Sequence, residues 1–503
     1  MNLIKIAFLN LIFSIATCAS LEAGEDVPEK PNIIWLMAED IANDLECYGV
    51  PGLQTPNLNQ LAEQGIRYNN CLSTNPISSP NRSAMLTGVH QNVLGAQHHR
   101  SNRNTPLSGP YKPITYWLRE AGYTCIIGHH GVMGKGRKID ANFKTSRLGP
   151  YDGKDQFGLF DKMDTFTPED QPFFAQIQLA VTHRGDWWNQ ISRQSSDPVD
   201  PDEVEMPPFM ADHPVVREDW ARYLDQIEYM DSEVGMIMEE LKEKGLDENT
   251  VVIFIGDNGR CNIRGKGYLF DSGLRVPLII RWPEGLEGGQ VSDQMVSVTD
   301  ISASILNMAG ARVPDYLTGV PFITEESHRD AVFSARDLWD EVLEQSRAIT
   351  TQRYKYIRHQ MPWVPYDAHQ AYLEFYRPAV HIMRPMDMKN ELTPVQAHFF
   401  KESKPAEELY DLKNDPYETN NLVDDPQYRE VLDELRGRLT AWEQRLPVTT
   451  PADFNFVTAR AVDLLDWVRY TKPNQYKQML EGKEIGFQRL NREYRQYKKS
   501  LNE

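Results

Sequence analysis

Acidic and amide side chains follow two apolar segments that lie far apart in the chain. Glu39 and Asp40 end the first segment, and Asp257 and Asn258 end the second. Adjacent carboxylates repel each other unless a cation lies between them, and hard cations such as Ca²⁺ take oxygen ligands. Either group alone could be a solvated loop or an ordinary turn. Two such groups at equivalent strand ends favour one shared metal site.

A serine-rich segment offers a second kind of chemistry. Ser79 can cap a helix that has Pro80 in its first turn, which places Ser78 at the positive end of that helix. Anions are favoured at this end, and Arg82 adds a fixed positive charge one turn later. A bare serine is a weak nucleophile, so catalysis at Ser78 requires an activating base or a modification. The alternative is a capped helix without chemistry.

Alternating strands and helices must position these residues. Short apolar runs predict buried strands at 32–38, 123–127, 173–181 and 251–255, and helical patterns cover 55–65, 114–121 and 218–244. This alternation predicts an α/β fold in which helices cover both faces of a mostly parallel sheet. Ligands of such sheets bind at the carboxyl ends of the strands, where both groups of candidates are expected.

The character of the chain changes after about residue 325. Shorter, more polar strands are predicted at 331–335, 347–358 and 407–415, with an amphipathic helix at 428–445. We interpret this region as a smaller antiparallel α+β subdomain. Residues 360–400 and the tail from 450 are aromatic-rich and are predicted to be irregular. The expected division is a catalytic domain at 25–325, followed by a C-terminal subdomain and tail at 326–503.

The first twenty residues predict an export signal. Lys5 precedes the apolar run 6–15, and small residues at 16–20 suit cleavage. The run is too short to span a membrane, and no later segment reaches about 18 apolar residues. We therefore expect a periplasmic or secreted protein that is not transmembrane. Lipidation at Cys18 and an ordinary N-terminal helix are the less favoured alternatives.

Composition limits the classes of partner. The 503 residues carry 53 Lys+Arg and 72 Asp+Glu, a net charge of −19, which disfavours nucleic acid and anionic membranes. The 41% of hydrophobic residues excludes a disordered chain. Four cysteines follow the signal and allow one or two disulfides, whose pairing the sequence does not choose; they are Cys47, Cys71, Cys125 and Cys261.

The serine segment also resembles a known signature. Ser78-x-Pro80-x-Arg82 followed by Leu86-Thr87-Gly88 is similar to the motif of formylglycine-dependent sulfatases, in which a Cys or Ser becomes Cα-formylglycine. Asn81 stands where the family usually has Ser. Further segments match in family order over nearly all of the mature chain; they are 31–40, 55–58, 182–183, 257–259, 266–277, 281–283, 353–358 and 408–412. The resemblance implies an alkaline-phosphatase-like fold.

The resemblance also implies roles for the matching residues. Ca²⁺ would be bound by the matured residue 78 and by Glu39, Asp40, Asp257 and Asn258, with Glu39 replacing the usual Asp. The hydrated aldehyde at residue 78 would attack sulfur, after which the alcohol or amine leaves. Positive charges stabilise the sulfuryl oxygens in the transition state. The family implies that Arg82 and Lys266 supply them, and that His183 contacts sulfate and protonates the leaving group. A structural histidine is the alternative.

One stretch departs from the family pattern. Either Lys135 or Lys138 could be the family's lysine, and we favour Lys138 because 138–143 (KIDANF) resembles a stretch of the heparan N-sulfatase subgroup. The second family histidine has no clean match, and His129, His130 and Asp140 are candidates.

Further residues are candidates for substrate binding. Residues 95–101 also resemble the heparan N-sulfatase subgroup, so His98, His99 and Arg100 could line a glycan subsite or form a solvated loop. Arg264 is expected to add to the positive pocket. Four aromatic residues could stack on sugars or belong to the core; they are Trp187, Trp188, Trp363 and Tyr366.

Three hypotheses follow. The first is a sulfatase acting on a sulfated saccharide, with Ca²⁺ and a formylglycine made from Ser78 by a serine-type radical maturation enzyme. The second is a phosphoester or phosphonate hydrolase of the same superfamily, which typically needs a second metal set that the sequence does not show convincingly. The third is a non-catalytic glycan-binding relative.

Overall fold

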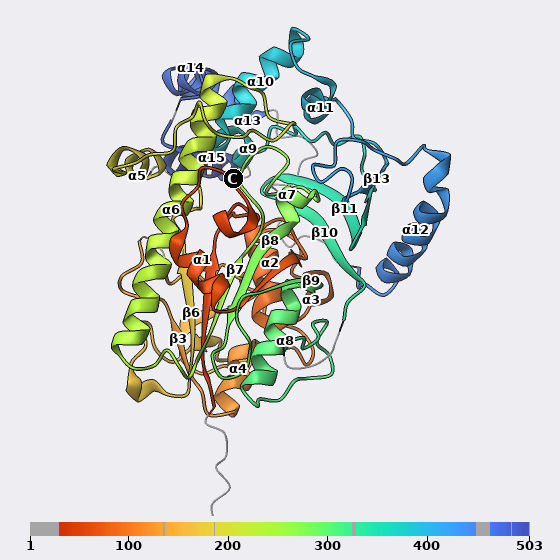
Figure 1. Ribbon diagram of the computed structural model, residues 1–503. Helices are drawn as coiled ribbons and strands as arrows, with labels where there is room; N and C mark the ends of the chain where they lie inside the picture. The colour runs from red at the N-terminus through yellow and green to blue at the C-terminus, as the bar shows by residue number, and fades with distance from the viewer. Residues whose placement is uncertain are drawn as a thin grey trace, which may run out of the picture.

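A computed structural model describes residues 30–133, 136–185, 187–323, 328–448, 463–483 and 485–501 (Figure 1). The predicted signal at 1–20, the possible lipidation site Cys18 and Lys135 lie outside these residues. Across the described residues, no helix combines the length and the apolar character that crossing a membrane would require.

A seven-stranded sheet forms the centre of the molecule, in the order β3-β6-β1-β7-β8-β2-β9. Its strands are β1 (Asn32–Ala38), β2 (Ile66–Leu72), β3 (Thr124–Ile127), β6 (Phe173–Leu179), β7 (Thr250–Gly256), β8 (Arg275–Arg281) and β9 (Gln290–Ser297). Only β8 runs antiparallel to its neighbours in this sheet. The mostly parallel α/β fold predicted from the sequence is therefore confirmed.

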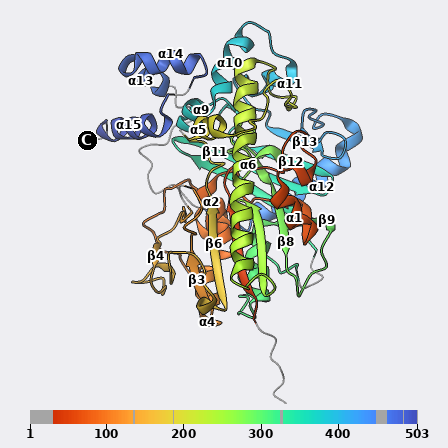
Figure 2. The same ribbon diagram turned by 60° about the vertical axis from the view of Figure 1, so that its left-hand side comes forward.

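Helices cover both faces of this sheet because its strands are apolar on both sides. In β1, Ile34 and Leu36 face one core and Ile33 and Trp35 face the other. The first core is covered by α1 (Pro56–Glu63), α5 (Trp188–Gln194) and the long α6 (Pro214–Glu243), which crosses the sheet in Figure 2. The second core is covered by α2 (Ser78–Thr87), α4 (Ile114–Glu120) and α8 (Val298–Met308).

A smaller antiparallel sheet follows, as predicted. Its strands, in spatial order, are β10 (Ala331–Trp339), β11 (Val342–Thr351), β12 (Tyr354–His359) and β13 (Glu407–Asp411). Helix α12 (Arg429–Glu443) packs on it through three leucines at helical spacing. The single strand predicted at 347–358 was wrong, because a turn at 352–353 divides it into two paired strands.

The regions predicted to be irregular contain helices, so that prediction was wrong. They form α9 (Ala371–Tyr376), α10 (Pro378–Met388), α11 (Pro394–Ala397), α13 (Asp463–Thr471), α14 (Pro473–Leu480) and α15 (Phe487–Ser500). Most of these helices are short, and Pro385 lies inside α10, which obscures the helical period. Their aromatic side chains pack into one buried cluster with the end of the sheet.

The remaining elements are short. They are β4 (Ser146–Leu148), β5 (Gly158–Phe160), α3 (Gln91–Leu94), α7 (Asp271–Leu274) and the 3₁₀ turns Glu46–Tyr48, Pro168–Asp170, His398–Phe400 and Pro426–Tyr428. The possible disulfides are not formed: Cys47, Cys71, Cys125 and Cys261 are free, and the last three are buried in the cores.

Candidate active site

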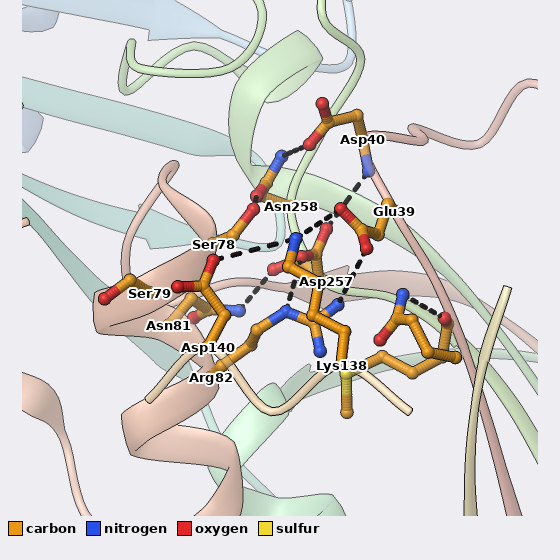
Figure 3. Close-up of polar contacts among 12 residues, drawn as sticks. Glu39, Asp40, Ser78, Ser79, Asn81, Arg82, Lys138, Asp140, Asp257 and Asn258 are labelled. Carbon is orange, nitrogen blue, oxygen red and sulfur yellow. Dashed lines mark hydrogen bonds and ion pairs between the residues drawn. The ribbon is translucent and has the colours of Figure 1, made fainter. Parts of the chain in front are cut away.

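The two predicted groups of oxygen ligands meet at the carboxyl edge of the sheet. Strands β1 and β7 are parallel neighbours with Ala38 opposite Gly256, so the residues that follow them lie side by side. The Asp40 amide donates to Asp257 Oδ1 at 3.0 Å, and Asn258 Nδ2 donates to Asp40 Oδ1 at 3.0 Å. These side chains are buried and face one another in Figure 3. The register of the sheet therefore joins groups more than 200 residues apart.

Ser78 reaches this cluster from the first turn of α2. Its hydroxyl donates to Asn258 Oδ1 at 2.9 Å and accepts from Lys266 Nζ at 3.1 Å. The predicted cap at Ser79 was wrong: the helix begins at Ser78, and Ser79 points away from the cluster in Figure 3. An early start of the helix thus places residue 78, rather than its neighbour, at the ligand groups.

Two further residues of α2 bind the end of β7. Arg82 Nε donates to Asp257 Oδ2 at 2.9 Å. Asn81 Nδ2 donates to the Asp257 carbonyl at 2.5 Å, and Asn81 Oδ1 accepts from the amide and hydroxyl of Thr74, each at 3.0 Å. Asn81, where the chain departs from the family motif, therefore fixes α2 against the strand end and the preceding loop.

Two lysines complete the cationic part of the site. Lys138 Nζ lies 2.5 Å from Glu39 Oε2, and Lys266 Nζ donates to Asp40 Oδ1 at 2.5 Å. Burial raises the pKa of Asp40, but Lys266 and His183 lower it by more, so this pKa lies below its usual range. Burial lowers the pKa of Lys266, but Asp40 and Asp257 raise it by more, so this pKa lies above its usual range. Both groups therefore stay charged near neutral pH.

His183 follows β6, the other neighbour of β1, as predicted. Its Nε2 atom lies 3.9 Å from Glu39 Oε2 and 4.0 Å from Asp40 Oδ2. Its Nδ1 atom lies 3.0 Å from the Arg184 carbonyl, which can only accept a hydrogen bond. The proton on Nδ1 is thereby fixed, and Nε2 is directed towards the carboxylates.

Unsatisfied atoms show what the cluster can still bind. Within the described ranges, Glu39 Oε1, Arg82 Nη1 and Arg82 Nη2 are buried and have no hydrogen-bond partner, although Arg82 Nη2 and Glu39 Oε1 form a long ion pair at 4.0 Å. A buried carboxylate oxygen without a partner suits a cation, and buried guanidinium N–H groups suit an anion. The oxygen donors fit a hard divalent ion. The site can thus hold a cation and an oxyanion together.

The chain matches the family model described as Sulfatase over residues 31–311. The chain belongs to the sulfatase family. A second model, described as N-sulphoglucosamine sulphohydrolase, C-terminal, matches residues 259–376 and 367–445. The family hydrolyses sulfate esters, so the protein is a sulfuric ester hydrolase.

Named sulfatases match most of the chain. An ulvan-active sulfatase of Formosa agariphila is 30% identical over 461 residues, covering 83% of this chain and 75% of that protein. Human N-sulphoglucosamine sulphohydrolase is 26% identical over 465 residues, covering 82% and 89%. These relatives confirm the resemblance to the heparan N-sulfatase-like subgroup.

Solved structures share the fold at low identity. One is a complex with its substrate D-glucosamine-2-N,6-O-disulfate, with a TM-score of 0.55, 18% identity and coverage of 83% of this chain and 98% of that one. Another is the phosphonate monoester hydrolase of Agrobacterium radiobacter, with a TM-score of 0.56, 18% identity and coverage of 83% and 96%. At this identity the likeness establishes the alkaline-phosphatase-like fold alone.

The sulfatase pocket opens in front of Ser78. Glu39, Lys138, His183 and Lys266 line one side, and His99 and Arg100 lie in its wall, as expected for substrate-binding residues. Arg100 is held by Asp140, which it contacts at 3.0 Å, and Lys138 Nζ lies 3.6 Å from the same carboxylate. Asp140, a candidate for the second family position, therefore orients two cations at the pocket.

Other sequence candidates lie elsewhere. Arg264 is buried, stacks on Phe270 before α7 and donates to the carbonyl of Glu418, in the loop after β13, at 2.6 Å. It therefore joins these two segments and is not among the pocket-lining residues. His98 is also buried outside this lining, with its carbonyl accepting from Asn142. His129 and His130 line an adjoining basic groove that shares Arg100 and Lys138 with the pocket.

Two other groups have the composition of metal sites. His129, His130 and Glu240 form one, but Glu240 is paired with Lys244 as well as with His129. Asp367, His369 and Glu374 form the other, where the Arg384 guanidinium lies between both carboxylates at 2.6 to 2.7 Å. Existing cations thus neutralise these groups, as Lys138 and Lys266 do at the strand ends.

Sequence reasoning missed one direct contact with the cluster. Tyr372, in α9, donates its hydroxyl to Asp40 Oδ2 at 3.0 Å and lines the pocket. It lies in a segment predicted to be irregular and carries no motif, so no sequence signal identified it. Of the aromatic candidates, Trp187 lines the pocket, Trp188 and Tyr366 are buried in the cores, and Trp363 is exposed.

Proposed function

We propose that the protein is an exported sulfatase that removes sulfate ester or N-sulfate groups from a sulfated carbohydrate, using Ca²⁺ and a formylglycine at residue 78. The observation that carries this proposal is the position of Ser78 Oγ, between Asn258 Oδ1 and Lys266 Nζ at the start of α2. The names of the relatives, ulvan-active sulfatase and N-sulphoglucosamine sulphohydrolase, support a sulfated saccharide as the substrate.

The strand-end oxygens would hold the calcium ion. Glu39, Asp40, Asp257 and Asn258 provide carboxylate and amide oxygens, and the buried Glu39 Oε1, which has no hydrogen bond, supports a cation there. The bound ion would place positive charge beside the sulfate oxygens.

Residue 78 and four further side chains then account for the steps at the sulfate. A formylglycine at residue 78, when formed, supplies a hydrated aldehyde whose oxygen is the nucleophile. Arg82, buried beside the pocket with its Nε bound to Asp257, would add positive charge behind the sulfate, and Lys138 and Lys266, which line the pocket, add charge that stabilises the transition state. His183 presents Nε2 to the pocket; in its doubly protonated form, with Nδ1–H bound to the Arg184 carbonyl, it would give the Nε2 proton to the leaving oxygen or nitrogen.

Two steps would precede catalysis. A serine-type radical maturation enzyme would oxidise Ser78, because no cysteine occupies that position. The N-terminal segment would then direct the protein to the periplasm or the exterior, where sulfated polysaccharides are found.

Mass spectrometry and a substrate panel test this proposal together. After co-expression with a serine-type maturation enzyme, the peptide that contains residue 78 should have lost two hydrogens. The same protein should release sulfate from one or more sulfated saccharides, with calcium present and not after chelation. An unmodified serine together with no sulfate release would refute the proposal.

The alternative is a phosphoester or phosphonate hydrolase, an activity that the name of one protein of the same fold carries. Turnover of matched aryl sulfates, phosphates and phosphonates separates the two. A non-catalytic glycan-binding relative would instead bind saccharides equally well before and after Ser78→Ala and release no sulfate.

A further inference from the structure

Helix α15, the last described helix, forms part of the pocket wall that faces Ser78. Gln488, Asn491 and Arg495 line the same pocket as Ser78 and Lys266. Residues separated by three and four positions lie on one face of a helix, so these three side chains come from a single face of α15. Both family models end before this helix, at residues 311 and 445. The family match therefore gives these residues no role.

The neighbouring face of α15 is anchored in the core. Phe487 stacks on Tyr376 with ring centroids 5.1 Å apart, and Tyr494 contacts Phe375 at 6.4 Å. Both partners belong to α9, the helix that also carries Tyr372 and its hydrogen bond to Asp40. Figures 1 and 2 show α15 beside α9. The polar face of α15 is thus held at a fixed position relative to the metal ligands.

The polar face has the chemistry of a saccharide-binding surface. Asn491 Oδ1 is buried and, among the described residues, has no hydrogen-bond partner, which is costly unless a ligand supplies a donor. The side-chain amides of Asn491 and Gln488 each carry N–H donors and an acceptor oxygen. Sugar hydroxyl groups both donate and accept hydrogen bonds, so they match these amides. A hydroxyl that donates to Asn491 Oδ1 would satisfy this atom.

Arg495 adds a positive charge at the rim of the pocket. Its Nη2 atom lies 2.9 Å from Asp340 Oδ1, while its side chain is 47% exposed. A guanidinium has five N–H donors, so one bond to Asp340 positions the group and leaves donors for a ligand. Arg100 lies in the wall of the same pocket, and Lys498 and Lys499 line an adjoining pocket that Arg100 and Arg495 share. The rim therefore favours an anion.

We propose that this face of α15 is the subsite that selects the sugar carrying the scissile sulfate. Asn491 and Gln488 bind its hydroxyl groups, and Arg495 binds a second acidic group of the same saccharide, either a carboxylate or another sulfate. The proposal rests on the proposed function, because it assumes that a sulfated saccharide enters the pocket with its sulfate at residue 78. The enzyme would then discriminate acidic from neutral saccharides.

Matched substrates and matched arginines test this assignment. The substrates share one scissile sulfate and carry either no second acidic group, a uronate carboxylate or a second sulfate. The variants are Arg495→Gln, Arg495→Lys and Arg492→Gln, the last removing an exposed arginine of the same helix outside both pocket linings. Steady-state kinetics give kcat and KM, and Ser78→Ala versions of each protein give saccharide affinity by calorimetry without turnover.

The expected result is selective. Arg495→Gln should lower kcat/KM for acidic saccharides at least about 10-fold more than for the neutral one, mainly by raising KM. In the Ser78→Ala protein, the same substitution should weaken the binding of acidic saccharides by a similar factor. Arg495→Lys should recover part of this loss, and Arg492→Gln should match wild type. The substrate with the larger loss identifies the second group as carboxylate or sulfate.

Other outcomes overturn the assignment. An equal loss on all substrates with a lower melting temperature would show that Arg495 only neutralises Asp340, and no loss would show that it does not bind substrate. If the wild-type enzyme releases no sulfate from any saccharide, the proposed function fails. Binding to the Ser78→Ala proteins still decides the role of Arg495, because Arg495→Gln either weakens acidic-saccharide binding selectively or does not.

Discussion

The two walls of the pocket are built in different ways. The wall at Ser78 comes from strand ends and α2, whose charged groups are buried and paired within a few ångströms of one another. The facing wall comes from α9 and α15, which carry aromatic, amide and half-exposed charged side chains. The register of a parallel sheet fixes the first wall. Helices that pack through aromatic rings place the second wall.

Burial predicts how each wall responds to mutation. Breaking a buried ion pair leaves an uncompensated charge and costs several kcal/mol, whereas exposed pairs contribute roughly 0–1 kcal/mol. The pairs of Arg82 with Asp257 and of Lys266 with Asp40 are buried, and Arg495 is half-exposed. Substitutions at the strand-end wall should therefore affect every substrate, and those at the helical wall should affect some substrates more than others.

Removal of the Ser78 hydroxyl should have the largest effect. Ser78→Ala cannot be converted to formylglycine, so the rate of sulfate release should fall at least about 10⁴-fold on all substrates. Ser79→Ala is the matched control, since Ser79 is buried but directed away from the cluster. Sulfate release is measured by ion chromatography. Comparable losses in both variants would mean that the fold of α2, rather than residue 78, was damaged.

Lysine substitution should have the second largest effect and separates two candidates. Lys138→Met removes the ammonium beside Glu39 and should lower kcat about 10²- to 10³-fold, because transition-state charge loses a partner. Lys135→Met should stay within a few-fold of wild type. Kinetics on one saccharide substrate measure both. A greater loss in Lys135→Met would assign the family's lysine to Lys135.

The strand-end wall could be predicted from sequence because its signals are local. Acidic residues directly after apolar strands imply ligands at one sheet edge, and this argument places Glu39, Asp40, Asp257, Asn258 and His183 correctly. The order of the strands could not be derived, because pairing depends on contacts between distant segments. The antiparallel sheet was also predictable, although its hairpin at 352–353 was not.

The helical wall could not be predicted in the same way. Tyr372 lies on the six-residue α9, which is too short to show a helical period. Asn491 and Arg495 lie on the 14-residue α15, whose buried Phe487, Leu490 and Tyr494 have helical spacing, but this spacing does not reveal what its polar face lies against. Arg264 failed in the opposite sense. Its charge suggested the pocket, but its guanidinium stacks on Phe270 and binds the loop after β13 at the Glu418 carbonyl.

The helical wall should also carry a pH dependence of stability. Burial and the neighbouring Asp340 raise the pKa of Glu341, which accepts from the Ala371 amide at the start of α9, to about 8. The folded protein therefore holds a proton that the unfolded chain loses near pH 4.5. The resulting stabilisation is complete below that pH and is lost as the pH rises to about 8.

Glu341→Gln should remove this dependence, because glutamine keeps the acceptor and does not titrate. The free energy of unfolding of Glu341→Gln minus that of wild type should be roughly 1–3 kcal/mol larger at pH 8 than at pH 5. Urea denaturation at the two pH values measures it. Glu434→Gln, on the exposed face of α12, serves as the control. Parallel pH profiles for wild type and Glu341→Gln would contradict the proposed protonation of Glu341.

The smallest effect is expected where the two walls meet. Tyr372→Phe removes the hydrogen bond to Asp40 Oδ2, while Asn258 and Lys266 continue to hold the other oxygen. A hydrogen bond to a charged group contributes about 1.5–3 kcal/mol when it is the sole partner, so a shared one should cost about 3- to 10-fold in kcat/KM. The calcium concentration for half-maximal activity should rise by a similar factor, because Asp40 is less firmly oriented.

Tyr376→Phe changes the ring stacked on Tyr372 without removing the bond to Asp40, so its calcium dependence should match wild type. Unequal losses among saccharides in Tyr372→Phe, with calcium dependence unchanged, would place Tyr372 with the substrate-selecting wall rather than with the metal ligands.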